Sequence, residues 1–362
     1  NSKTSILGFD NFRKRIQDLR NKIDETGEID QIGDLKHSNL EFSSDIKYLL
    51  NKDVYIIAVP TPVDNINKPD LNILKTATKT VAEAIKNSND SKTCKCIIYE
   101  STVYPGATEE ICLPIIEKIT EQKAGDNITI GYSPERINPA DKNHRLNNIV
   151  KIVSGFDKDT LDFIEKVYSM IVEAGIHRAS SIKVAEAAKV IENIQRDLNI
   201  ALVNELSIIF NKLDINASEV LDAAATKWNF VRYAPGLVGG HCIGVDPYYL
   251  TYKAETVGYH PEVILAGRRI NDSMGSWIAT LAIKKLLSKN NMTSNKVKVA
   301  IFGFTYKSNC PDIRNTKVND IYKSLTEFGC EIDVTDPHAD KDSVQDNYKI
   351  NLADERTIFN KK

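Results

Sequence analysis

Hydrophobic residues gather in short runs that alternate with amphipathic segments through the first half of the chain. Residues 53–59 (DVYIIAV) form a near-continuous apolar run that stops at Pro60-Thr61-Pro62. Such runs are typical of parallel strands buried on both faces. Further strands are predicted at 4–9, 96–99, 128–132 and 149–154, and helices at 11–22 and 71–87. The alternation predicts a doubly wound α/β domain.

From residue 181 to about residue 213 the pattern changes to that of one long helix. Ser180 and Ser181 supply an N-cap signal at its start. Apolar residues recur along the helix at helical spacing and form a single stripe. The stripe comprises Val184, Ala187, Ile191, Ile194, Leu198, Leu202 and Ile209. We expect this helix to separate two α/β domains and to serve as the surface of a homodimer.

A second α/β unit is predicted after this helical middle. A further helix is expected over residues 262–289, and the apolar run 297–303 (VKVAIFG) is typical of a strand. The predicted fold class is therefore α/β, with two doubly wound Rossmann-like domains joined by a long central helix and a helical middle domain. The predicted domains are 1–180, 181–290 and 291–362.

Composition and charge narrow the function classes. The 362 residues are 42% hydrophobic and 27% charged, with a formal net charge of −2. That balance gives no pull toward nucleic acid or an anionic membrane, and no apolar run is long enough to span a bilayer. The six cysteines form no C-x-x-C pair, which favours reduced thiols in a cytoplasmic protein over disulfides. No Cys/His cluster suggests a metal, and we expect none.

The segment 235–247 (PGLVGGHCIGVDP) combines candidate chemistry with backbone freedom. Its glycines at positions 236, 239 and 240 allow the chain to turn and to approach a ligand closely. The same loop presents the Cys242 thiol and, four residues later, the Asp246 carboxylate. Taken alone, a free cysteine in such a loop is more often a small buried hydrophobe than a nucleophile.

Lys189 and Asn193 lie four residues apart in the long helix and therefore share one face. At 100° per residue they lie roughly opposite the apolar stripe. Two interpretations stay open. One is a solvated polar face, the commoner fate of such residues, and the other is a cation and an amide donor placed together for an oxyanion. Arg196 lies near the same face and fits either interpretation.

Polar residues follow two of the predicted parallel strands. Residues 100–103 (ESTV) follow one strand and residues 132–136 (YSPER) end another. Ligand sites of α/β proteins form at the carboxyl ends of such strands, although either segment could be ordinary strand-end capping. Asp10 ends the first predicted strand, where it could bind an adenosine ribose or simply cap the next helix.

Together these segments resemble the UDP-glucose/GDP-mannose dehydrogenase family. The matching stretches occur in family order and cover nearly the whole chain. They are AVPTPVD (58–64), YESTVYPG (99–106), GYSPERINP (131–139), KVAEAAKVIEN (183–193), GLVGGHCIGVDPYYL (236–250) and GFTYKSNCPDIRNT (303–316). The resemblance implies an N-terminal NAD-binding domain, a central helical domain with the cysteine loop, and a C-terminal UDP-sugar-binding domain. NAD is the implied cofactor, and a UDP-sugar the implied substrate.

The resemblance also implies a two-step oxidation of a sugar C6 alcohol to the carboxylate. An aldehyde is a poor hydride donor, so a thiolate must add to it before the second hydride leaves, and water then cleaves the resulting thioester. Cys242 is the implied nucleophile, with Lys189 and Asn193 stabilising the oxyanion. Asp246 and Thr102 would hold or activate the water, and Glu135 would assist as acid or base.

The remaining implied contacts are with the cofactor and the substrate. The NAD contacts are Asp10, Arg15, Thr61, Thr102 and Arg314. The substrate contacts are Glu135, Arg136, Asn138, Lys189, Asn193, Arg232, Tyr233, Gly239 and Lys307, some of which a partner subunit could supply. Close relatives carry an arginine where this chain has Ala234, and Arg232 is the candidate to replace it.

The loop resembles most the branch that acts on UDP-N-acetylhexosamines, UDP-GlcNAc or UDP-GalNAc, for surface polysaccharides such as capsule and O-antigen. Members that use UDP-glucose show Pro-Lys-Asp after the cysteine, where this chain has Gly244-Val245-Asp246. UDP-glucose oxidation stays an alternative, as does a nucleotide-sugar-binding protein that has lost catalysis. A single-step hydroxyacid dehydrogenase would share the helical Lys/Asn pair, but it needs no thiol, so Cys242 argues against it.

Both ends of the sequence differ from the pattern that the resemblance implies. The phosphate-binding G-x-G-x-x-G expected at the first βα turn is absent, and the C-terminal domain is short. We expect the first strand with its glycine loop, and part of the last domain, to lie outside this sequence.

Overall fold

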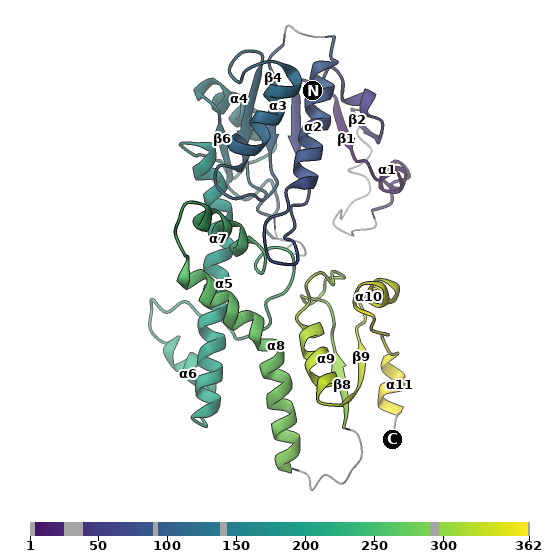
Figure 1. Cartoon of the computed structure of the whole chain (residues 1–362), viewed down its shortest axis with the longest axis vertical. Coiled ribbons are helices and arrows are strands. Elements are labelled where there is room, and N and C mark those ends of the chain that lie inside the picture. The colour runs from purple at the N-terminus through teal and green to yellow at the C-terminus, as the bar shows by residue number, and fades with distance from the viewer. Residues whose placement is uncertain (1–3, 25–38, 90–92, 138–142, 290–296, 361–362) are drawn as a thin grey trace. The chain divides into compact units, whose positions relative to one another are not determined.

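The computed structural model describes residues 4–24, 39–89, 93–137, 143–289 and 297–360. The chain divides into two compact units. The N-terminal unit comprises residues 1–62 and 69–189, and the C-terminal unit comprises residues 63–68 and 190–362. The long helix α5 (Ile182–Lys212) begins in the first unit and ends in the second (Figure 1).

A largely parallel sheet forms the centre of the N-terminal unit. Its strands lie side by side in the order β3 (Val54–Ile57), β4 (Lys95–Tyr99), β5 (Ile128–Tyr132), β6 (Lys151–Gly155) and β7 (Ile176–Arg178). A separate two-stranded sheet pairs β1 (Ile6–Phe9) with β2 (Leu40–Ser43) in parallel. Helix α1 (Arg13–Arg20) follows β1 in the chain.

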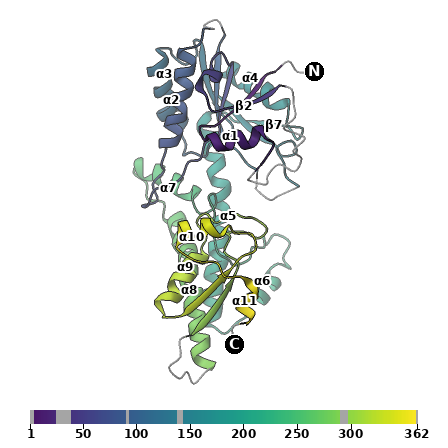
Figure 2. The ribbon, with the colours of Figure 1, turned by 90° about the vertical axis from the view of Figure 1, so that its right-hand side faces the viewer.

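Helices cover both faces of the central sheet, because successive side chains of a strand point to opposite faces. Ile98 of β4 packs with Ile164 and Tyr168 of α4 (Lys158–Ser169). On the other face, the hydroxyl of Tyr99 lies 3.1 Å from Thr78 Oγ1 of α2 (Asn72–Lys86), and α3 (Leu113–Thr120) packs on α2. Figure 2 shows α2 and α3 on one side of the sheet and α4 on the other. The predicted doubly wound α/β class is confirmed.

Two strands of this sheet, β6 and β7, run opposite to the other three. The sequence predicts continued alternation of strands and helices through residues 128–154, but β6 pairs antiparallel with β5, with Gly131 opposite Gly155. In the described part of residues 133–150 no helix carries the chain back across the sheet, and an antiparallel neighbour needs none. Gly131 also lets α4 pack closely, since a Cβ there would lie 2.1 Å from Ile164 Cδ1.

The C-terminal unit combines the later part of α5 with further helices and a small parallel sheet. The described helices are α6 (Ala217–Ala224), α7 (Asp246–Thr256), α8 (Glu262–Lys289), α9 (Val318–Glu327), α10 (Lys341–Tyr348) and α11 (Glu355–Asn360). Strands β8 (Lys298–Phe302) and β9 (Glu331–Thr335) pair in parallel. Phe304, Val334 and Val344 lie in the core of this α/β part.

The long helix is confirmed at nearly its predicted ends, and the backbone N–H of Val184 donates to the Ser181 hydroxyl at 3.2 Å. Its apolar stripe, however, is largely exposed in this chain, including Ile191, Leu202 and Ile209. Among the described residues, none of the helices is both long enough and apolar enough to cross a membrane.

Candidate active site

The cysteine loop leads directly into helix α7. Backbone N–H groups of Val245 and Asp246 donate to the carbonyl oxygen of Cys242, at 3.0 and 2.8 Å. This turn places the half-buried Cys242 and the start of α7 next to each other, and Pro247 fits the first helical turn because its missing N–H would lack a partner there. The Asp246 side chain is only 2% exposed. A thiol and a buried carboxylate therefore share one tight turn.

Asn193 of α5 reaches the same turn. Its side-chain amide donates to Oδ2 of Asp246 at 2.6 Å, and its own oxygen lies 3.4 Å from Nη1 of Arg196. Asn193 and Lys189 are 6% and 8% exposed. These two side chains are buried, so the interpretation of their face as a solvated polar surface is wrong.

The buried polar face extends along much of α5. Glu186, Asp197 and Asn204 are fully buried as well. Such burial requires hydrogen-bond partners, and Asn204 illustrates them: its amide oxygen accepts from Gly236 N at 2.8 Å, and its Nδ2 donates to Gly236 O at 3.0 Å. Sequence reasoning named neither Glu186 nor Asp197 nor Asn204, although polar residues recur there at helical spacing.

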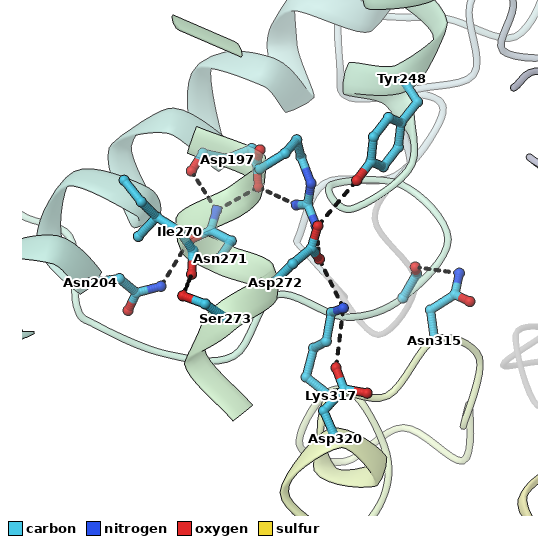
Figure 3. A network of polar contacts seen from close by, with 12 residues as sticks. Asp197, Asn204, Tyr248, Ile270, Asn271, Asp272, Ser273, Asn315, Lys317 and Asp320 are labelled. Atoms are coloured by element: carbon cyan, nitrogen blue, oxygen red, sulfur yellow. Dashed lines mark hydrogen bonds and ion pairs between the residues drawn. The ribbon is translucent and has the colours of Figure 1, made fainter. Parts of the chain in front are cut away.

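Figure 3 shows the polar network that continues from α5 through α8 to the start of α9. Asp197 and Asp272 each accept a hydrogen bond of 2.6 Å from the buried Arg268. Asp272 also lies 2.8 Å from Nζ of Lys317, which lies 3.3 Å from Asp320. The two carboxylates compensate the buried guanidinium, which would otherwise be costly to desolvate. The network thereby links the central helices to the C-terminal α/β part.

The segment 312–316 of that α/β part holds the cysteine loop from the other side. Gly240 N donates to Arg314 O at 3.1 Å, and Asn315 Nδ2 donates to Gly240 O at the same distance. Gly240 has φ +81°, and a Cβ there would lie 2.7 Å from the Tyr306 ring. Only glycine allows both this backbone conformation and this close approach.

His241 lies beside the nucleophile candidate and faces an acidic partner. Its Nδ1 is 3.6 Å from Oδ2 of Asp312, and its ring meets that of Tyr306 edge to face. Interaction with Asp312, and then with Cys242, raises the pKa of His241 to about 9. Burial opposes ionisation of Asp312, but the neighbouring His241 and the hydrogen bonds from Arg314 outweigh it and lower the Asp312 pKa. A cationic imidazole at neutral pH therefore lies next to the thiol.

Several residues of the C-terminal unit that are predicted to contact NAD or the UDP-sugar form hydrogen bonds or ion pairs with other residues of the chain. Arg314, predicted to touch NAD, forms hydrogen bonds with both carboxylate oxygens of Asp312. Arg232 pairs with Asp222, and the hydroxyl of Tyr233 lies 3.4 Å from Gln195 Nε2. The Lys307 carbonyl accepts from Thr305 Oγ1 at 3.1 Å, and a Cβ at Gly239 would lie 2.8 Å from Asn315 O.

In the N-terminal unit, predicted residues meet where parallel strands end. Thr61 follows β3, and its hydroxyl donates to the carbonyl oxygen of Thr102, after β4, at 2.6 Å. Glu135 follows β5 and accepts from Ile137 N at 2.5 Å, and Arg136 donates to Val150 O at 2.9 Å. Asn138 lies outside the described residues.

Asp10 and Arg15 lie near the end of β1. The Asp10 carboxylate accepts from Phe12 N at 2.8 Å, as a local turn before α1, and remains exposed. Arg15 pairs with Asp24 at 2.8 Å, while its Nη1 is buried without a hydrogen-bond partner in the described part of the chain. A carboxylate for ribose hydroxyls and a spare guanidinium donor suit the adenosine half of a dinucleotide.

Glu186 supports the loop that carries Thr102. Its two carboxylate oxygens accept from the backbone N–H groups of Gly106 (2.5 Å) and Thr108 (2.9 Å). Burial raises the pKa of Glu186 to about 7, against the lowering effect of the Thr108 and Gly106 hydrogen bonds. One end of α5 is thus tied to the loop between β4 and α3.

No group of three or more His, Cys, Asp or Glu side chains able to hold a metal ion occurs among the described residues.

A cavity of about 370 Å³ borders the cysteine loop, and its lining includes Gly240, Gly244, Val245 and Tyr248. The loop therefore faces open space on the side of Gly244.

Known proteins match the chain over nearly its full length. The UDP-glucose/GDP-mannose dehydrogenase family matches through its NAD binding domain (residues 1–172), central domain (183–273) and UDP binding domain (300–360). Protein CapL from Staphylococcus aureus is 52% identical over 357 residues, which are 99% of this chain and 82% of CapL. UDP-N-acetyl-D-glucosamine 6-dehydrogenase from Pseudomonas aeruginosa is 49% identical over 348 residues, 96% of this chain and 81% of the relative. The solved structure of a UDP-D-ManNAc dehydrogenase from Pyrococcus horikoshii matches with a TM-score of 0.85 at 27% identity, covering 93% of this chain and 79% of that one.

Proposed function

The chain belongs to the UDP-glucose/GDP-mannose dehydrogenase family, and on that premise we propose that it oxidises the C6 alcohol of a UDP-N-acetylhexosamine twice, to the carboxylate, through a thioester on Cys242. Its cofactor is NAD, in keeping with the matched NAD binding domain. The observation that carries the proposal is the hydrogen bond of 2.6 Å between Asn193 and Asp246 in the turn that begins at Cys242.

The reaction needs a nucleophile because of the second oxidation. The first oxidation removes a hydride from C6 and a proton from its hydroxyl, which leaves an aldehyde. The Cys242 thiolate then adds to the aldehyde carbon, and the resulting tetrahedral alkoxide can lose a second hydride to become a thioester. Water cleaves the C–S bond, which releases the carboxylate and regenerates the thiol. When bound, NAD supplies the acceptor for each hydride, so two NADH form per acid.

The residue types assigned to the reaction suit these steps. We assign Lys189 and Asn193 to the oxyanion of the tetrahedral adduct, since an ammonium and an amide N–H both stabilise developing negative charge. Asp246 and Thr102 are assigned to the hydrolytic water, and Glu135 to proton transfer. Because Asp246 already accepts from Asn193, its carboxylate is oriented toward α5.

The donor set of the N-terminal unit fits NAD. Thr61 and Thr102 follow the neighbouring parallel strands β3 and β4, and Asp10 follows β1 of the separate parallel pair, in each case at the carboxyl end, where dinucleotides bind in α/β sheets. The buried Nη1 of Arg15, which has no hydrogen-bond partner among the described residues, provides a further donor nearby in sequence. We assign these four residues, together with Arg314, to NAD contacts, and Arg136, Asn138, Arg232, Tyr233, Gly239 and Lys307 to contacts with the UDP-sugar.

Two lines support an N-acetylated sugar. Relatives about half identical to this chain are named UDP-N-acetyl-D-glucosamine 6-dehydrogenase. The loop residues Gly244 and Val245 are small and uncharged, and both border the cavity of about 370 Å³, which leaves room for a 2-acetamido group. The product keeps its nucleotide diphosphate and is therefore an activated glycosyl donor, which suits the assembly of a surface polysaccharide.

The exposed apolar stripe of α5 supports a homodimer. Ile191, Leu202 and Ile209 are each more than 40% exposed along one face of a helix, and an interface would remove such apolar side chains from water. We propose that a second copy covers this stripe.

A panel of UDP-sugars tests the proposed function. UDP-GlcNAc, UDP-GalNAc and UDP-glucose are compared by NADH absorbance and by product mass. We expect two NADH per uronic acid and a higher kcat/KM for an N-acetylated sugar than for UDP-glucose. Lost contacts are worth about 1–3 kcal/mol per group, so UDP-glucose should be a poor substrate and not an inert one. A clear preference for UDP-glucose would overturn the substrate assignment, and one NADH per turnover would overturn the two-step reaction.

A further inference from the structure

We propose that Lys151 is a positioning residue for the reaction: with Glu100 and Tyr168, it ties the loop after β4 to the loop after β5 and so fixes Thr102 relative to Glu135. This inference rests on the proposed function, which gives Thr102 and Glu135 their roles. Lys151 itself lies in none of the motifs that carry the family resemblance.

The reversed direction of β6 brings Lys151 to the ligand edge of the sheet. Lys151 is the first residue of β6, and β6 runs antiparallel to β5. Its start therefore lies at the edge where β4 and β5 end. Lys95, the first residue of the parallel strand β4, lies at the opposite edge. A lysine at the start of β6 can reach the candidate site only because β6 runs opposite to β3, β4 and β5.

The ammonium of Lys151 contacts both loops. Nζ lies 3.0 Å from Oε1 of Glu100, which stands two residues before Thr102. It also donates to the carbonyl oxygen of Pro134, directly before Glu135, at 3.0 Å. Tyr168 of α4 completes the group: its ring lies 5.1 Å from Nζ, and its hydroxyl donates to Oε1 of Glu100 at 2.5 Å.

Burial makes these contacts obligatory. Lys151 is 1% exposed, and the Glu100 side chain is 14% exposed. Burial, together with the neighbouring Glu100, raises the pKa of Tyr168, so its hydroxyl keeps its proton and remains a donor. A buried ion pair adds little net stability compared with apolar residues of similar size, but removing one partner leaves the other charge uncompensated. The group is therefore better suited to hold geometry than to add stability.

Neighbouring bonds extend this geometry to the reacting groups. Ser133 donates to Ile152 O at 2.7 Å, which fixes the second loop against β6. Ser101 donates to Val59 O at 2.7 Å, which fixes the first loop against the end of β3. Thr102 and Glu135 are thus held by fixed neighbours, and a displacement of about 1 Å in such groups can cost on the order of a hundredfold in rate.

The test compares Lys151→Met with Lys95→Met. Lys95 is also buried, and it pairs with Asp53 at 3.1 Å, at the other edge of the same sheet. Both variants remove a buried ammonium from the first residue of a strand. Because the side chain of Asp53 is 66% exposed and that of Glu100 only 14%, Lys151→Met should destabilise the fold more, and activity is therefore compared per folded protein. We measure thermal unfolding, and kcat and KM per folded protein with NAD and UDP-GlcNAc. Lys151→Met should lower kcat at least tenfold with KM within about threefold, whereas Lys95→Met should keep kcat within about twofold.

Glu100→Gln provides a second variant, which keeps the size of the side chain and removes only the charge. We expect it to lower kcat in the same direction, and the mass of the quenched enzyme should show more thioester than in the wild type. Equal kcat in the Lys151 and Lys95 variants would overturn the inference, as would normal kcat in Glu100→Gln if Lys151→Met fails to fold. Failure of the proposed function would show separately, as acid formation by Cys242→Ala.

Discussion

The side-chain amide of Asn193 donates a hydrogen bond of 2.6 Å to Oδ2 of Asp246. Asn193 lies within the long helix α5, and Asp246 is the first residue of α7. Asp246 N also donates to Cys242 O. Asp246 is therefore bonded both to α5, through its side chain, and to the cysteine loop, through its backbone. The orientation of the carboxylate next to the thiol therefore depends on a residue of the central helix.

Asp246→Asn tests the assignment of this carboxylate to the hydrolytic water. The amide keeps the size of the side chain but cannot accept a proton, and loss of a general base commonly costs on the order of 10²–10⁴ in rate. We expect rapid formation of about two NADH per enzyme followed by very slow turnover, with a thioester visible by intact mass. Asn199→Asp, on an exposed part of α5, serves as control. Wild-type turnover by Asp246→Asn would contradict the assignment.

Cys242→Ala tests the covalent step. Without the thiol no adduct can form, so acid formation should fall below detection, while NAD and UDP-sugar binding persist. Cys242→Ser should leave at most a slow, trapped adduct. The serine hydroxyl is a much weaker nucleophile than the thiolate, and water cleaves an oxygen ester more slowly than a thioester. Cys330→Ala removes another partly buried thiol of the same unit and should retain activity. Full two-NADH turnover by Cys242→Ala would exclude the thioester route.

Lys189→Ala tests the oxyanion assignment. Removal of one oxyanion donor costs about 10²–10³ in rate, so kcat should fall by that order while α5 stays folded. Lys183→Ala is the matched control, since Lys183 lies on the same helix with an exposed partner, Glu110, at 3.4 Å. If both variants retained the wild-type rate, Lys189 would have a structural role only.

The limits of α5 could be predicted from the sequence, but its buried face could not. Ser181 and the apolar stripe gave a helix over 181–213, and the structure has Ile182–Lys212. The stripe itself is largely exposed, while Lys189, Asn193 and Asp197 are buried. Apolar spacing shows that one face differs from the other, but the same stripe fits a core and a subunit surface. Which face this unit buries depends on partners distant in sequence, such as Asp246 and Arg268.

Strand direction and buried charge pairs could not be predicted from the sequence either. Residues 149–154 have the apolar pattern of a strand, and that pattern is the same for both directions, so the reversal of β6 was missed. In the sequence, Lys151 is an ordinary charged residue at the end of a strand. Only the structure shows its contacts with Glu100 and Pro134. The cysteine loop was found because glycines, a thiol and a carboxylate stand together in sequence. Asp312, which faces it, was missed because it comes from another part of the chain.

Glu186→Gln tests the pH dependence that the buried carboxylate predicts. Its pKa of about 7 in the folded protein is raised above its ordinary value of 4.5, so the folded state binds the proton more tightly than the unfolded state. The associated stability is fully present below about pH 4.5 and is lost as the pH rises through 7. The loss is on the order of a few kcal/mol.

The measurement compares thermal unfolding of wild type and Glu186→Gln between pH 5 and 8. The variant should be less stable at low pH, because the amide satisfies only one of the two backbone N–H donors, but its profile should be flatter. Glu205→Gln, at an exposed position of the same helix, should keep the wild-type profile. Parallel profiles of wild type and Glu186→Gln would exclude the predicted titration.

The last prediction concerns the ion pair of His241 and Asp312. Asp312 raises the pKa of His241 to about 9, above its ordinary value of 6.5. A raised histidine pKa contributes stability that is fully present below about pH 6.5 and is lost as the pH rises through 9. Asp312 stays ionised over that range because its own pKa is lowered. The effect should be modest, since 35% of the His241 side chain is exposed.

His241→Gln should therefore lower the melting temperature at pH 6 and have little effect at pH 10, where the imidazole is neutral in the wild type as well. His260→Gln is the matched control, because His260 faces Glu255 at 3.8 Å on an exposed part of the same unit. It should change little at either pH. An equal loss by His241→Gln at both pH values would mean that the ring acts only through its packing against Tyr306, and that its charge does not hold the cysteine loop to segment 312–316.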